Sequence, residues 1–240
     1  MMPNQTAEAS PITLKSHVVG KLRAAILSGH YVPGDRLNET QLAAEFKTSR
    51  IPIREALIQL QESGLVMNHE RRGMCVTKLS EEDQQRINSV RMILETEALW
   101  LARKNMTPEI AAQLEDVVQR MENAHDLVSE AGPLDIEFHR LIWKASGNPY
   151  LARALDSLVA QLFAHKTIEH QGFAKSASQK AREEFRVWRV DHHRELLDVV
   201  MNRTDVDPET AVLSHLRAGF TNPESFSSYE DRSQAKKDKP

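Results

Sequence analysis

The chain has 240 residues, with 31 Lys and Arg against 34 Asp and Glu, and it carries a formal net charge of -3 and a single cysteine. One cysteine excludes an intramolecular disulfide framework or a cysteine-rich zinc module and indicates a reducing compartment. The longest apolar runs, such as residues 24–27, are far too short to cross a bilayer, and the first residues lack the pattern of a signal peptide. We therefore expect a cytoplasmic protein with no membrane partner.

The charge is divided unevenly along the chain. Residues 1–80 hold ten Lys and Arg against seven Asp and Glu, whereas the remainder holds 21 against 27. The acidity of the whole chain, which by itself argues against a nucleic-acid partner, therefore averages a basic first segment with an acidic second one. This asymmetry predicts two domains with different functions.

Apolar residues at helical spacing over 18–27 predict a first helix, and Gly29 is placed to end it in the left-handed conformation. Asn38, followed three residues later by Gln41, resembles a capping box and predicts a short second helix. The turn between these two helices contains a Pro-Gly pair.

A third helix is predicted to begin after Thr48 or Ser49 and to end at residues 63–64, a Ser-Gly pair. Two short apolar stretches, residues 65–67 and 74–77, flank a polar turn with a glycine and predict a β-hairpin. Three helices followed by a hairpin indicate a winged helix-turn-helix.

The predicted winged helix-turn-helix domain spans residues 12–79. Arg50 and Arg54 are four residues apart, so both project from one side of the third helix near the end that enters the major groove, where guanidinium groups reach guanine or phosphates. Arg71 and Arg72 at the hairpin tip can meet phosphates or the minor groove. The residues expected to bind DNA are Thr40, Gln41, Ser49, Arg50, Ile51, Pro52, Arg54, Arg71, Arg72 and Gly73.

Two arginines on a short helix can also form an ordinary solvent-exposed face without a binding function. Here the helix pair, the turn and the basic wing follow one another in order, which favours DNA binding. The stretch LRAAILSGHYVPGDRLNETQLAAEFKTSRIPIREALIQLQESGLV, with the RRG that follows, resembles the DNA-binding domain of the GntR family of bacterial transcription regulators. The resemblance implies that Arg50 and Arg54 contact bases or phosphates of double-stranded operator DNA and that Gly73 belongs to the wing. Where some family members have an arginine early in the second helix, this chain has Thr40.

From Ser80 onward the sequence predicts an all-α antiparallel bundle of about six helices over residues 80–222. The Ser-rich, charged tail, residues 223–240, is expected to be disordered. The predicted helices cover residues 80–105, 107–129, 133–145, 150–170 and 176–202, and a sixth starts near 207. In the first of them the residues at core spacing are Ile87, Val90, Leu94, Ala98 and Leu101.

Four polar residues are candidates for a site inside this bundle. Asp135 and His139 are four residues apart, on the face that carries Ile142, so both are expected to point inward. His193 and His215 each lie among apolar neighbours in later helices. Three imidazoles and a carboxylate suit zinc, nickel or manganese, although a lone helical histidine is more often a core or capping residue.

The D-x-x-F-H motif at Asp135, the HRELLD stretch from His193 and the late His215 are similar to the FCD ligand-binding domain of the FadR-type branch of the same family. That resemblance implies a metal held by Asp135, His139, His193 and His215, which in turn holds a small carboxylate or sugar-acid effector. It also implies that Arg91, in an R-x-x-x-E element, faces the effector pocket. The alternative interpretation of Arg91 is a surface ion pair with the glutamate four residues later.

These observations predict a transcription regulator, and specifically a repressor, that is not an enzyme and that binds two operator half-sites as a homodimer under control of an organic-acid effector. The alternative is a metal-dependent enzyme, because an Asp/His site with open coordination positions can activate water. No separate general base accompanies the four candidate ligands in the sequence, and a DNA-reading domain has no obvious use in a hydrolase.

Overall fold

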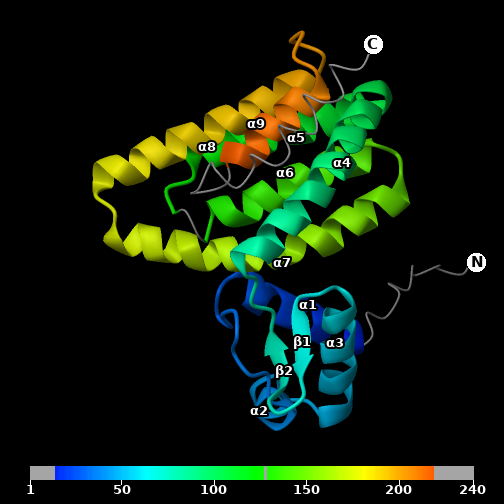
Figure 1. Ribbon diagram of the computed structural model, residues 1–240, viewed down its shortest axis with the longest axis vertical. Coiled ribbons are helices and arrows are strands. Elements are labelled where there is room, and N and C mark those ends of the chain that lie inside the picture. Colours follow the sequence, from blue (N-terminus) through cyan, green and yellow to red (C-terminus); the bar gives the residue numbers. More distant parts are fainter. Residues whose placement is uncertain (1–13, 127–128, 219–240) are drawn as a thin grey trace, which may run out of the picture. The chain divides into compact units, whose positions relative to one another are not determined.

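The computed structural model describes residues 14–126 and 129–218, and the tail expected to be disordered, residues 223–240, lies outside these ranges. The chain divides into two compact units, Met1–Thr77 and Lys78–Pro240. Helices dominate the described parts of both units, and the strands found there form one two-stranded sheet in the first unit (Figure 1). The predicted fold class, a winged helix-turn-helix followed by an all-α bundle, is confirmed.

The helices of the first unit begin and end at residues suited to those positions. Asn38 caps the second helix, because its side-chain oxygen accepts hydrogen bonds from the backbone N–H groups of Thr40 and Gln41. Gly29 and Gly64 have φ values of 76° and 73°, so the chain can reverse direction directly after the first and third helices. The three helices are α1 (Leu14–Leu27), α2 (Glu39–Glu45) and α3 (Arg50–Glu62).

A hairpin completes the first unit. Its antiparallel strands are β1 (Val66–His69) and β2 (Gly73–Val76). Cys75, the chain's single cysteine, lies opposite Met67 in this ladder, forms an isolated bridge with Arg36 on its other side and is 1% exposed. Helix α1 packs against α3, and the hairpin follows α3 directly. Fully or almost fully buried in this unit are Val18, Leu22, Ile26, Ile53, Leu57, Leu60, Leu65, Val66 and Val76.

The second unit is a bundle in which six helices are described. Ser80 and Asp83 form a capping box at the start of the first helix. Thr107 and Asn148 cap the second and the fourth helix, both of which begin with a proline. The helices are α4 (Glu81–Asn105), α5 (Pro108–Asn123), α6 (Ala131–Ala145), α7 (Pro149–Ser176), α8 (Gln179–Val200) and α9 (Pro208–Ala218).

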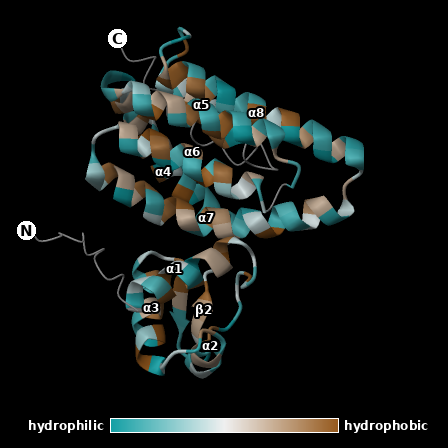
Figure 2. Ribbon diagram, turned by 180° about the vertical axis from the view of Figure 1, so that it is seen from behind, coloured by the Kyte–Doolittle hydropathy of each residue, from teal (hydrophilic) through white to brown (hydrophobic). Residues whose placement is uncertain are grey.

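Helix α4 is in contact with α6, α7, α8 and α9, while α5 packs on α6 and α8. The bundle helices carry both hydrophobic and hydrophilic residues, as helices with one buried and one exposed face do (Figure 2). The largest side chains that are fully buried in this core are Leu99, Leu114, Met121, Phe138, Ile142 and Leu155. Within residues 14–126 and 129–218, no helix has the length and apolar character needed to span a membrane.

Two expectations about the bundle helices were wrong. Val90 is 42% exposed, and the buried face of α4 instead includes the polar residues Asn88, Arg91 and Glu95. The second bundle helix ends at Asn123, before the predicted end near 129, because the chain turns there. The carboxylate of Glu130 accepts hydrogen bonds from the backbone N–H groups of His125 and Asp126 in that turn.

Candidate functional site

The first candidate surface is the N-terminal part of α3. Arg50 and Arg54 are exposed, and Ile51 between them is 71% exposed. Both arginines pair with Glu39 at the start of α2: Arg54 donates two hydrogen bonds of 2.8 Å to its carboxylate, and Nη2 of Arg50 lies 3.5 Å from it. The hydrogen bonds from Arg54 lower the pKa of Glu39, so the carboxylate is charged and holds the two guanidinium groups at one place on the surface.

Of the remaining residues expected to bind DNA, most are exposed and one is buried. Thr40 and Gln41 are exposed in the first turn of α2, and Ser49 is exposed just before α3, where its side chain makes no capping hydrogen bond. Pro52 is buried with the apolar face of α3, so the structure does not bring it to the exposed surface. In the hairpin, Gly73 has a φ of 75° at the start of β2, directly after the exposed side chains of Arg71 and Arg72.

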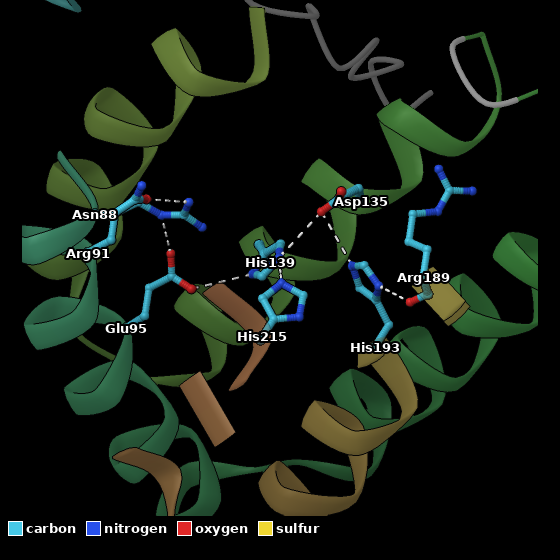
Figure 3. Close-up of polar contacts among 8 residues, drawn as sticks. All are labelled: Asn88, Arg91, Glu95, Asp135, His139, Arg189, His193 and His215. Atoms are coloured by element: carbon cyan, nitrogen blue, oxygen red, sulfur yellow. Dashed lines mark hydrogen bonds and ion pairs between the residues drawn. The ribbon is translucent and has the colours of Figure 1, made fainter. Parts of the chain in front are cut away.

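The second candidate site lies inside the bundle, where three histidines from α6, α8 and α9 converge (Figure 3). One ring nitrogen each from His139, His193 and His215 all lie within 4.8 Å of one another. The Nε2 atoms of His139 and His215 are 3.0 Å apart. Oδ1 of Asp135 is 3.3 Å from Nε2 of His193 and 3.4 Å from Nε2 of His139. The structure therefore brings the four predicted residues together.

Hydrogen bonding indicates which nitrogens carry protons. Nδ1 of His193 lies 2.8 Å from the backbone carbonyl oxygen of Arg189, which can only accept, so Nδ1 donates and Nε2 presents a lone pair. Nε2 of the same ring lies 3.3 Å from Oδ1 of Asp135. Nδ1 of His139 is 3.7 Å from a carboxylate oxygen of Glu95. These ring nitrogens, together with the carboxylate of Asp135, could hold a metal ion.

The protonation equilibria decide what kind of cation fits. Burial lowers the pKa of His215 well below its usual value, and the nearby His139 and His193 lower it further, so its imidazole is neutral. Burial by itself would raise the pKa of Asp135, but its contacts with His139 and His193 outweigh burial and keep the carboxyl ionised. One carboxylate and three imidazoles are a donor set that suits zinc, nickel or manganese.

Arg91 lies in the interior of the bundle. Its Nε donates a 2.8 Å hydrogen bond to Glu95, and Nη1 donates one of 3.2 Å to Asn88. The side chains of Arg91 and Glu95 are only 5% and 2% exposed, so the interpretation as a surface ion pair was wrong. Because Glu95 also approaches His139, this row of side chains connects the arginine to the histidine cluster (Figure 3).

A cavity of about 330 Å³ adjoins the cluster and runs between α7 and α8. Arg91, Lys166 and Arg189 supply cationic groups to its wall. Apolar and aromatic side chains form much of the remainder: Val159, Leu162, Phe163, Phe173, Phe185, Trp188 and Leu216. An apolar pocket with a few converging polar groups is the usual form of a small-molecule site.

Two residues of these sites were missed by sequence reasoning: Glu39 and Arg189. A charged residue on a helix is ordinarily placed in solvent, and hydropathy gives no signal for a buried charged pair. The R-x-x-x-E spacing identified Glu95 as the partner of Arg91, since side chains four residues apart share one helix face, but it did not show that the pair is buried. No comparable signal existed for Glu39, whose partner Arg54 is fifteen residues away in the next helix.

Two family models match the chain. Residues 14–76 match the model described as bacterial regulatory proteins, gntR family, and residues 86–218 match the FCD domain. The second match alone covers more than half of the chain. Each match falls within one of the two compact units.

Curated relatives are transcriptional regulators. The chain is 34% identical to the HTH-type transcriptional regulator YdhC of Bacillus subtilis over 57% of its length, and the aligned part spans 62% of that protein, less than two thirds. It is 27% identical to the Nta operon transcriptional regulator of Aminobacter aminovorans, over 81% of this chain and 87% of that one. The gluconate operon transcriptional repressor of Bacillus subtilis is 31% identical over 59% of this chain and 58% of its own. These relatives favour a regulator over the enzyme alternative.

Solved structures show the same fold. Escherichia coli McbR/YncC matches with a TM-score of 0.72 at 20% identity, covering 90% of this chain and 99% of that one. A GntR transcriptional regulator from Rhodococcus sp. RHA1 matches with a TM-score of 0.62, also at 20% identity, covering 92% and 96%.

Proposed function

The chain belongs to the GntR family of bacterial regulatory proteins and carries an FCD domain, and from this premise we propose that it is a transcriptional repressor that binds operator DNA as a homodimer and responds to an organic acid. The DNA is bound by the first unit, and the acid is bound with a divalent metal in the cavity of the second. The observation that carries the proposal is the pair of exposed arginines, Arg50 and Arg54, at the start of a recognition helix.

The DNA-binding part of the proposal rests on exposed side chains of α3 and of the hairpin. Arg50 and Arg54 can contact guanine or phosphates, and Ile51 can contact a thymine methyl group in the major groove. Arg71 and Arg72 add cations at the wing. Removal of a good bidentate base contact costs about 1–3 kcal/mol of discrimination, and a phosphate contact costs affinity on every sequence.

A direct test starts from random duplexes, from which the wild-type protein selects its own binding sequence. Arg54→Ala is then expected to abolish the shift of that duplex in a gel, whereas Arg194→Ala, which removes an exposed arginine from α8 in the other unit, leaves it intact. Undiminished sequence-specific binding by Arg54→Ala would contradict the proposed DNA surface.

The effector part of the proposal rests on the histidine cluster. Asp135, His139, His193 and His215 would hold the metal, which supplies open coordination positions for a carboxylate. Arg91 lines the adjoining cavity, where a guanidinium can bind a carboxylate through two hydrogen bonds. A ligand that binds one conformation of the regulator more tightly than another then shifts its operator affinity. The gluconate operon repressor among the relatives supports sugar acids as one class to screen.

The dimer is supported by the outward face of α4. Val90, Ile93 and Trp100 are 42%, 63% and 51% exposed and lie at helical spacing on the face opposite Arg91. Three large apolar side chains in a row on one helix form the kind of patch that soluble proteins ordinarily cover. A second copy of the chain would cover it and would place two recognition helices on one operator.

A further inference from the structure

Arg189 is a buried cation with no counter-charge in contact among residues 14–126 and 129–218. It lies on α8, one helical turn before His193, and the residue is 4% exposed. None of its three guanidinium nitrogens has a hydrogen-bond partner among the described residues, although each is buried. A guanidinium has five N–H donors, and a buried charge without partners is strongly unfavourable. The feature therefore indicates that an anionic group binds there.

Neighbouring residues do not supply that group. Asp135 is the nearest candidate, but its carboxylate is committed to His139 and His193, and no ion pair joins it to Arg189 within the described part of the chain. Arg91, by contrast, is already bound to Glu95 and Asn88. The two arginines therefore differ, because only Arg189 has all its donors available.

Arg189 also lines the cavity beside the histidine cluster. Figure 3 shows Arg91 on one side of the cluster and Arg189 on the other. They come from α4 and α8, so a ligand in the cavity can meet a cation at each of two places. At about 330 Å³ the cavity falls at the lower end of the usual range for small-molecule pockets, which leaves room for more than one carboxylate group.

We propose that Arg189 binds a second anionic group of the effector, so that the effector of this regulator is a diacid with one carboxylate at the histidine cluster and the other on Arg189. The inference rests on the proposed function, because it assumes that the first carboxylate binds at the cluster. The guanidinium fork of Arg189 can receive the second carboxylate through two parallel hydrogen bonds. The buried cation then gains its counter-charge only when the ligand is bound.

The test compares acids that differ only in the second carboxylate. Malonate, succinate, glutarate and adipate are titrated against propionate, butyrate, valerate and hexanoate, the monoacids with the same numbers of carbon atoms. The full-length protein loaded with zinc is used, and binding is followed by the fluorescence of Trp188, which lines the cavity. The metal content of each protein is measured in parallel.

For the wild-type protein we expect at least one diacid to bind about 10–100 times more tightly than its matched monoacid, as charge-assisted hydrogen bonds predict. Arg189→Gln is expected to remove this preference while it leaves the metal content and the affinity for the monoacid unchanged. Arg189→Lys, which keeps the charge but not the fork, is expected to retain part of the preference, and it carries the test if Arg189→Gln does not fold. Arg182→Gln, at an exposed position on the same helix, is the matched control.

Two results would overturn the inference, and they are distinguishable. If the wild-type protein holds zinc and binds acids but shows no preference for any diacid, or if the preference survives in Arg189→Gln, the second site is refuted and the proposed effector site stands. If the wild-type protein holds no zinc and binds neither series, the proposed effector site fails together with this inference.

Discussion

The guanidinium of Arg54 and the carboxylate of Glu39 form a pair of parallel 2.8 Å hydrogen bonds between α3 and α2. Arg50 shares the same carboxylate at 3.5 Å. A fork-to-fork pair of this kind fixes the orientation of the arginine as well as its position. Glu39 thus reduces the positive charge offered to phosphates and restricts the directions in which the two arginines can approach a base.

Replacement of Glu39 by Gln is therefore expected to have opposite effects on two kinds of binding. Affinity for unrelated duplex DNA should rise, because the surface loses a negative charge. The ratio of operator affinity to unrelated-DNA affinity should fall, by about tenfold, since a freed Arg54 loses the geometry needed for base readout. Gel-shift titrations on both duplexes at one salt concentration measure this ratio, and Glu55→Gln, an exposed change on α3, serves as control. An unchanged ratio would show that Glu39 does not orient Arg54.

Asp135→Ala and His193→Ala are each expected to lower the metal content of the purified protein strongly, because each removes one of the converging donor atoms. His192→Ala is the matched control. Its ring lies beside that of Trp188 and its Nδ1 contacts the carbonyl oxygen of the same residue, outside the cluster of three histidines. Elemental analysis after dialysis measures the metal. Full occupancy in both variants would return Asp135 and His193 to a structural role.

The stability of the bundle is expected to depend on pH through His170, which lines the cavity. Burial lowers its pKa from 6.5 to about 4, and the charge of Lys166 contributes to the shift. As the pH falls, the unfolded chain therefore takes up this proton before the folded chain does. The contribution to the free energy of unfolding is constant above about pH 6.5 and is lost between pH 6.5 and 4, with a loss of at most about 3 kcal/mol.

Tryptophan fluorescence measures this effect selectively, because the three tryptophans, Trp100, Trp143 and Trp188, all lie in the bundle. Urea unfolding in the presence of a chelator at several pH values should show a shallower pH dependence for His170→Gln than for the wild-type protein. His125→Gln, at an exposed position, should behave like the wild type. Equal slopes for His170→Gln and the wild type would contradict the lowered pKa.

Ile93→Asp is expected to convert the proposed dimer to a monomer, because it places a charge on the apolar face of α4, where Ile93 is 63% exposed. Sedimentation velocity at micromolar concentration measures the mass. Val187→Asp introduces the same charge at a 44% exposed position on α8 and should leave the mass unchanged. A dimer that persists in Ile93→Asp would exclude this face as the interface.

Sequence reasoning succeeded where local chemistry decides the structure. The cap at Asn38, the glycine stop at Gly29 and the proline start of α5 depend on residues within one turn of the chain, so their positions could be predicted. The convergence of Asp135 and His139 followed from their spacing on one helix. Their contacts with His193 and His215 depended on how separate helices pack, and the resemblance to a known domain supplied that information.

The failures occurred where polar groups are buried. Val90 was predicted to be buried, because hydropathy assigns a valine to the core. For Arg91 two interpretations remained, a surface ion pair and a residue of the effector pocket, because hydropathy assigns an arginine to solvent. In the structure Arg91 donates hydrogen bonds to Glu95 and Asn88, which allows its charge to be buried. Burial of this face of α4 turns Val90 outward. Tertiary packing overrode the hydropathy of the helix.

The position of Cys75 has a practical consequence for the study of this protein. The only thiol of the chain is enclosed in the hairpin ladder and 1% exposed, so it is a poor target for reagents that need access to sulfur. A cysteine introduced at an exposed position, for example at Arg71 in the wing or at Asp116 on α5, would then react selectively with a maleimide or a nitroxide. The natural sequence already provides the background for site-directed labelling, and distances between two labels can follow the wing and the bundle as operator and acid are added.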